Sequence, residues 1–392
     1  MSLAVVRTEA ISVVGEFAVA FSIYVLVTGL ARAIVTDGVL AAQSSNEPFR
    51  QGSGRACAIG VAVAPAVVIV GSCVGSPYIT ITGVMLPGLV LYDYNKMISL
   101  GVGRAGTALA EAIIWVGVTA IAVLLCLFLS VSPCALFTVW AGSGAALGLV
   151  GARLRRCRIL PAWGLRHAET KVCASFGLLF MFTSGAVQLA TTALAVTVGA
   201  GVVGALAAAR TVLAPVTLLQ VAASSLVIPY LARRKAASKR VRLQASLRVT
   251  GLATGLILPL ALILPMLPDS VGTALLAANW QIAQPLLAAL AVESMLAMAA
   301  RVGLDGHRIQ QAGRRALLIG ALIGGAYVVL VVAGGLAFQA YGAAYAMVVV
   351  ALFGSALCWW SYVSLLSEDP PVSRSLPGEQ ASVRFTVAPT DQ

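Results

Sequence analysis

Long apolar runs, separated by short polar segments, repeat along the whole chain. A run of 18 or more apolar residues is long enough to cross a bilayer as a helix. The alternation of polar and apolar positions that is typical of an outer-membrane barrel is absent. The pattern predicts an all-α polytopic membrane protein with about 11 transmembrane helices. Their expected ranges are 10–31, 56–76, 78–98, 106–131, 134–152, 172–198, 201–231, 247–267, 281–300, 315–337 and 340–366.

A basic segment at 153–171 divides these helices into two sets, with five before it and six after it. Transporters are often built from two similar halves. We expect an N-terminal helical lobe at 1–152, a basic cytoplasmic linker at 153–171 and a C-terminal helical lobe at 172–366. The polar, proline-rich residues 367–392 predict a disordered cytoplasmic tail. The uneven count indicates that one helix of a six-plus-six plan is missing at the front.

Composition agrees with a membrane location. Hydrophobic residues make up 60% of the 392 residues and charged residues only 10%, whereas soluble domains carry about 25% charged residues. The net charge of +12 follows from topology, because Lys and Arg collect on cytoplasmic loops; nucleic-acid binding is not expected. All basic residues except Arg7 and Arg210 fall in alternate loops or the tail. We therefore predict a multi-pass protein of the cytoplasmic membrane with its C-terminus in the cytoplasm and its N-terminus outside.

Arg210 is the charged residue of the apolar stretch 199–232. A charge at the centre of a membrane helix costs about 2.5–3.5 kcal/mol and usually faces protein or a watery cavity. Because a guanidinium suits phosphate, we predict that Arg210 attracts an anionic substrate group. The alternatives are a pair with a buried carboxylate or a side chain that reaches the outer interface. Polar residues at helical spacing on the same helix and on its neighbour predict one wall of a substrate cavity: Ser184, Gln188, Thr217, Gln220 and Ser224.

Two acidic residues within expected spans are candidates for ion coupling or for a counter-charge. Glu293 lies inside the ninth helix and could pair with Arg210, bind a proton or cation, or lie near the cytoplasmic interface. Glu111 lies seven residues after Arg104, about 10 Å from the start of its helix. We expect Glu111 to line the cytoplasmic mouth of the N-terminal lobe.

The sequence contains no pattern typical of an enzyme. GxxxxGK[ST], HExxH and GxSxG motifs are absent, and both histidines lie in segments expected to be cytoplasmic loops. The seven cysteines include no CxxC pair, so packing is their expected role. We expect no catalytic residue, no metal site and no cofactor.

Four segments resemble one transporter family. The sequence "GALAAARTVLAPVTLLQVAASSLVIPYLARR" (204–234) is similar to the eighth-helix region of the polysaccharide exporter or O-antigen flippase family. That family belongs to the multidrug/oligosaccharidyl-lipid/polysaccharide (MATE-like) superfamily. The segments 16–40, 86–109 and 275–290 resemble the second helix, the fourth helix and the ninth-to-tenth connection of actinobacterial members.

The resemblance implies two lobes around a central cavity and transport by alternating access. The first helix of the family has no counterpart in this sequence. The implied function is a flippase for a lipid-linked oligosaccharide or related cell-envelope polysaccharide precursor. Its implied partners are a polyprenyl-diphosphate glycan substrate, membrane lipids and enzymes of cell-envelope glycan biosynthesis. Two alternatives remain: a MATE-type small-molecule or multidrug antiporter, and a non-transporting scaffold or degenerate copy.

Overall fold

The computed structural model describes residues 1–41, 46–129, 131–163, 167–234, 237–310 and 312–368. Within these ranges the secondary structure is helical, with no strand. The segment expected to be a disordered tail falls outside them from residue 369 onward. The helices are α1 (Ser2–Thr8), α2 (Ile11–Ala31), η1 (Arg32–Thr36), α3 (Asp37–Ala41), α4 (Asn46–Val74), α5 (Pro77–Gly101), α6 (Ala105–Leu129), α7 (Pro133–Leu154), α8 (His167–Phe180), η2 (Met181–Gly185), α9 (Ala186–Thr197), α10 (Ala200–Val212), α11 (Ala214–Ala232), α12 (Lys239–Ile263), η3 (Leu264–Met266), α13 (Asp269–Leu276), η4 (Ala277–Asn279), α14 (Trp280–Ile309) and α15 (Gly313–Glu368).

The all-α membrane fold is confirmed, and each of the eleven expected ranges overlaps a helix. By length and composition, eight of the described helices can cross a membrane, or nine if α10 and α11 form one bent span. The count differs from eleven partly because α15 holds two expected spans. Its backbone leaves helical geometry at Phe338 and Gln339, and Gly354 lies against Ile323. The chain therefore reverses direction within α15, and its two halves pack side by side.

The helices extend beyond the expected spans at the end of the molecule that carries the basic residues. Arg50 and Arg55 lie in α4, and Arg32 lies in the π-helix η1, although the sequence placed all three in a loop. At the same end, α14 continues to Ile309, nine residues past the expected end of its span at 300. Hydrophobicity marks only the length that lies in hydrocarbon, and a helix continues past it wherever backbone hydrogen bonds continue.

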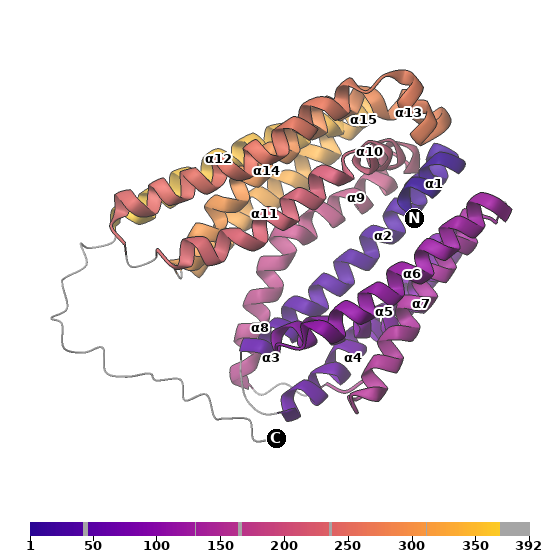
Figure 1. Ribbon diagram of the computed structural model, residues 1–392, viewed down its shortest axis with the longest axis horizontal. Coiled ribbons are helices and arrows are strands. Elements are labelled where there is room, and N and C mark those ends of the chain that lie inside the picture. The colour runs from indigo at the N-terminus through magenta and orange to yellow at the C-terminus, as the bar shows by residue number, and fades with distance from the viewer. Residues whose placement is uncertain (42–45, 130, 164–166, 235–236, 311, 369–392) are drawn as a thin grey trace.

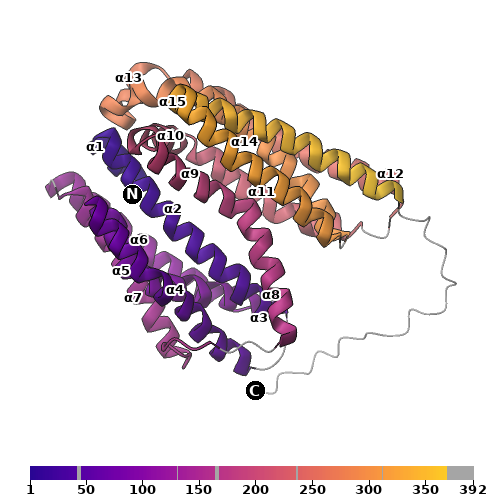
Figure 2. The same ribbon diagram turned by 180° about the vertical axis from the view of Figure 1, so that it is seen from behind.

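Two groups of helices diverge from a common end (Figure 1). One group contains α4 to α7, and the other contains α11 to α15; α2 and α8–α9 run between them, as Figure 2 shows from behind. The helix α2 packs on α5, on α9 and most extensively on α10. It therefore connects the N-terminal group, through α5, to α9 and α10, which in turn pack on α14 and α15.

Connections rich in Lys and Arg gather at one end of each group. In the C-terminal group, Lys239 Nζ donates to Ser367 Oγ at 2.7 Å and Arg242 Nη1 donates to Gln310 Oε1 at 3.0 Å. In the N-terminal group, the backbone of residue 158 bonds to that of Arg50. The predicted sorting of basic connections to one side is thus seen in the fold. We call this side the basic end; which compartment it faces stays a prediction.

The opposite end is where the two groups meet tightly. Its connections between helices carry no Lys or Arg, although Arg7, Glu9 and Asp269 lie there, and we call it the uncharged end. A Cβ atom on Gly15 of α2 would overlap the carbonyl of Ala200, and one on Gly204 of α10 would overlap the carbonyl of Ile11. Only glycine allows two helix backbones to approach so closely. The crossing of α2 and α10 consequently brings two helix backbones into direct contact at the uncharged end.

Candidate functional site

Arg210 lies in the last turn of α10, where α10 and α11 are bent by 66°. Its Nη2 donates to Tyr327 Oη at 3.2 Å and lies 3.3 Å from Met347 Sδ. The bend occurs beside Pro215, the second residue of α11, because proline cannot donate the backbone hydrogen bond that a straight helix needs. Tyr327 and Met347 come from the two halves of α15. Arg210 is therefore held by the paired halves of α15.

Glu293 on α14 is the acidic neighbour of Arg210. Its carboxylate is close enough for its charge to stabilise the guanidinium, yet the ion pairs within 4 Å in the described part of the chain do not include these two residues. Both residues are half-buried. The two charges thus lie in one cluster, and the roles predicted for each remain predictions.

The other candidates for the cavity wall have separate surroundings. Gln220 Nε2 donates to the backbone carbonyl of Ser294 at 2.6 Å, and Ser224 Oγ donates to the carbonyl of Gln220 at 2.7 Å. These bonds tie α11 to α14. Ser184 and Thr217 are exposed, and Gln188 is half-buried. Since the bend after Arg210 interrupts the seven-residue spacing to Thr217, a continuous polar face on one straight helix is not formed.

Glu111 lies in the N-terminal group, on α6. Its Oε1 accepts a 2.7 Å hydrogen bond from Arg155 Nη2, just after α7. Nearby, Asn95 Nδ2 donates to the carbonyl of Gly148 at 2.9 Å. Glu111 Oε2, Arg155 Nη1 and Tyr92 Oη are buried without a protein partner among the described contacts. The arrangement joins α5, α6 and α7 and leaves donors and an acceptor that suit a water molecule.

Sequence reasoning missed a further charged pair. Arg32 in η1 donates through Nε to Asp93 Oδ2 at 3.0 Å, and its Nη2 makes a second bond to Oδ1. This bidentate geometry is the strongest form of an Arg–carboxylate contact. The sequence feature that could have revealed this pair is Asp93 within the span 78–98, because an acidic side chain inside a span needs a nearby cation. The sequence had placed Arg32 in a loop, which hid the match.

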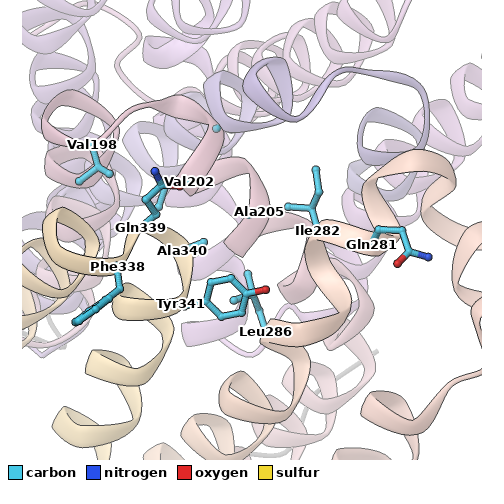
Figure 3. A pocket seen from close by; sticks show the side chains of 11 residues that line it. Val198, Val202, Ala205, Gln281, Ile282, Leu286, Phe338, Gln339, Ala340 and Tyr341 are labelled. Carbon is cyan, nitrogen blue, oxygen red and sulfur yellow. The ribbon is translucent and has the colours of Figure 1, made fainter.

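A cavity of about 890 Å³ opens at the uncharged end of the C-terminal group (Figure 3). Its walls come from the α9–α10 turn, the first turns of α14 and the reversal of α15. The side chains of Tyr341, Gln339 and Val202 are among those that line it. None of its lining residues is charged. Its volume is in the range of small-molecule sites.

Comparison with solved structures identifies the fold. A multidrug resistance MATE family transporter of the MOP superfamily, in an inward-facing conformation, matches with a TM-score of 0.76 over 93% of both chains at 12% identity. The lipid II flippase MurJ, in an inward closed conformation, matches with a TM-score of 0.66 over 93% of this chain and 86% of its own, at 11% identity. A MATE structure in complex with MaD3S gives 0.60 at 12% identity, covering 94% and 92%.

The chain therefore has a MATE-like fold, as the sequence resemblance implied. No protein-family model and no curated protein match the sequence. At identities this low the structural likeness establishes the architecture, and the substrate has to be argued from the residues.

Proposed function

We propose that the chain is a membrane transporter that works by alternating access and moves a lipid-linked oligosaccharide or a related cell-envelope polysaccharide precursor. The observation that carries this proposal is Arg210, a cation at the bend between α10 and α11 that Tyr327 and Met347 hold in a MATE-like fold. A polyprenyl-diphosphate substrate presents an anionic group that a guanidinium can bind. The match to the lipid II flippase MurJ agrees with a lipid-linked substrate.

Alternating access requires two helix groups that can close and open against each other. The crossing of α2 and α10 through Gly15 and Gly204 supplies a tight seal at the uncharged end. In this proposal the N-terminal lobe at 1–152, which includes α4 to α7, and the C-terminal lobe at 172–366, which includes α11 to α15, move against each other. The basic end faces the cytoplasm, in agreement with the positive-inside rule.

The second candidate is a MATE-type small-molecule antiporter. It is favoured by the match to a multidrug transporter, whose TM-score is higher than that of MurJ. Under this alternative Glu293 or Glu111 exchanges a proton or cation, and Arg210 acts only as a counter-charge to Glu293. The two candidates therefore differ in what happens when Arg210 is removed.

A reconstitution experiment separates them. The full chain is placed in proteoliposomes, and transport of a fluorescent polyprenyl-diphosphate sugar is compared with proton-driven uptake of a cationic dye. We expect sugar-lipid movement that falls at least tenfold in Arg210→Met and partly recovers in Arg210→Lys, because a buried charge-assisted contact is worth about 1.5–3 kcal/mol. Arg242→Met is the matched control, because that arginine bonds to Gln310 at the basic end.

The outcomes are distinct. Undiminished sugar-lipid movement by Arg210→Met contradicts the site assignment. Dye uptake without sugar-lipid movement supports the antiporter, and the absence of both activities in a folded sample contradicts the transporter proposal.

A further inference from the structure

The segment 155–163, which follows α7, is fastened to the first turns of α4. The backbone N–H of residue 158 donates to the carbonyl of Arg50 at 3.3 Å. Ser53 Oγ donates to the carbonyl of Arg158 at 2.7 Å, and Ala162 N–H donates to the carbonyl of Gly54 at 3.1 Å. Ser53 is fully buried beneath the segment. These bonds hold a segment without helix or strand in a defined place.

Close packing reinforces the hydrogen bonds. A Cβ atom on Gly54 would lie 3.2 Å from the carbonyl oxygen of Leu160 and 3.3 Å from the Cβ of Ala162. The segment also turns at Arg156, whose φ of 53° lies in the left-handed region. Since backbone groups make most of these contacts, the side chains of the segment remain available to face outward.

The attachment fixes the depth of the segment relative to a membrane. The apolar run of α4 begins at Ala56, directly after Arg55, and that of α7 ends at Ala152, directly before Arg153. Gly54 therefore lies near the point where α4 enters the hydrocarbon. A segment hydrogen-bonded to Gly54 lies at the level of the lipid headgroups on the basic end. In Figures 1 and 2 the start of α4 and the end of α7 lie together at that end of the N-terminal group.

The exposed side chains here combine cations with large apolar groups. Arg50, Arg153, Arg156 and Arg158 are exposed. Leu160 is 79% exposed and Trp163 is 60% exposed. The sequence 153–163 contains no acidic residue. Tryptophan favours the membrane–water interface, and arginines near the surface attract anionic lipids.

We infer that Arg50, Arg153, Arg156, Arg158, Leu160 and Trp163 form a docking surface for the anionic phospholipids of the leaflet at the basic end. The occupant follows from charge complementarity and depth. The four exposed guanidiniums lie at the level of the headgroup phosphates, and that of Arg50 is held there by its Nε bond to the carbonyl of Arg156 at 3.0 Å. Leu160 and Trp163 enter the layer of glycerol esters. We call these six residues the headgroup surface. It is separate from the transport site, and it anchors the N-terminal group to one leaflet.

The test measures lipid binding by the full chain. Protein purified in neutral detergent is titrated with phosphatidylglycerol or phosphatidylcholine, and bound lipids are counted by native mass spectrometry. Arg153→Gln/Arg156→Gln/Arg158→Gln is compared with Arg240→Gln/Arg248→Gln/Arg314→Gln, which removes three exposed arginines elsewhere. Each surface arginine contributes on the order of fivefold in affinity, so the first triple variant should lose more than tenfold for phosphatidylglycerol and the control much less.

A second measurement reports the place of contact. In nanodiscs, phospholipids brominated close to the ester groups should quench part of the tryptophan fluorescence of the wild type. The Trp163→Phe variant should lack this quenched part. The quenched part should be larger with anionic than with zwitterionic lipid, and the difference should shrink at high salt. This readout remains valid if either triple variant folds poorly.

Three results would overturn the inference. One is equal loss of phosphatidylglycerol in both triple variants, which would show an effect of total charge alone. Another is a Trp163 quenching signal that does not depend on the lipid headgroup. The third is displacement of the bound phosphatidylglycerol by a polyprenyl diphosphate, with one molecule bound for each molecule released. That result would make the surface a substrate site.

Discussion

Asn279, just before α14, donates its side-chain amide to the backbone carbonyls of Val6 at 2.6 Å and Glu9 at 2.9 Å. These carbonyls belong to the end of α1, which would otherwise lack partners there. Both N–H groups of one buried amide therefore tie the beginning of the chain to the C-terminal group. The bond lies at the uncharged end, beside the crossing of α2 and α10.

Asn279→Ala should weaken this end of the molecule. Two backbone carbonyls lose their donors, at a cost of about 1–3 kcal/mol for buried unsatisfied groups. Thermal unfolding in detergent should begin at a lower temperature than in the wild type. Asn279→Asp should be at least as harmful, because carboxylate oxygens would face the carbonyl oxygens, whereas the exposed neighbour Gln281 should tolerate alanine. Equal stability of the Asn279 and Gln281 variants would contradict this role.

Gly204→Leu should open the uncharged end. Even a Cβ at Gly204 would overlap the carbonyl of Ile11, so α2 and α10 must separate. Labelling of a cysteine introduced at the buried Val203 by a membrane-impermeant maleimide should become faster. Gly201→Leu is the control, since a Cβ there meets nothing within 4 Å. Unchanged labelling in Gly204→Leu would show that the crossing does not close this end.

The contact between Arg32 and Asp93 should stabilise the packing of η1 on α5. Asp93 is 12% exposed at its side chain and Arg32 is 42% exposed, so solvent screening reduces the value of the pair below that of a fully buried one. We expect Arg32→Gln and Asp93→Asn each to lower the unfolding temperature. The double variant should cost less than the sum, with a coupling of about 0.5–3 kcal/mol. Strict additivity would mean that the contact contributes nothing.

Arg210 and Glu293 should depend on each other. Arg210→Met leaves a carboxylate in the C-terminal group without its neighbouring cation, at a cost of about 1–3 kcal/mol. Arg210→Met/Glu293→Gln should regain part of that stability, because no unpaired charge remains. Thermal unfolding measures this, and transport measures the substrate role. Recovery of both stability and transport in the double variant would favour a structural pair over an anion site.

The orientation of the chain can be read by labelling intact cells. Cysteines are placed at the exposed positions Leu160 and Gln339, at the basic and the uncharged end respectively, in a chain without its native cysteines. An impermeant maleimide should label position 339 and not position 160 before lysis. The reverse result would contradict the positive-inside assignment.

Three properties could be predicted from the sequence alone: the membrane class, the approximate positions of the helices and the sorting of basic connections to one end. These properties are local: an apolar run of sufficient length must form a helix in lipid, because every backbone group has to be bonded within the segment. The bend beside Pro215 also has a local cause, since a proline removes a backbone hydrogen bond wherever it is placed in a helix.

Which polar groups meet became clear from the packing of the helices in three dimensions. Tyr327 and Met347 are 117 and 137 residues from Arg210, and no local pattern indicates that the two halves of α15 would hold it. Arg32 was assigned to a loop until η1 placed it against Asp93. The fastening of residues 155–163 to α4 depends on backbone bonds that carry no sequence signal. Contacts between distant segments follow from how whole helices pack, and hydrophobicity along one segment does not encode that packing.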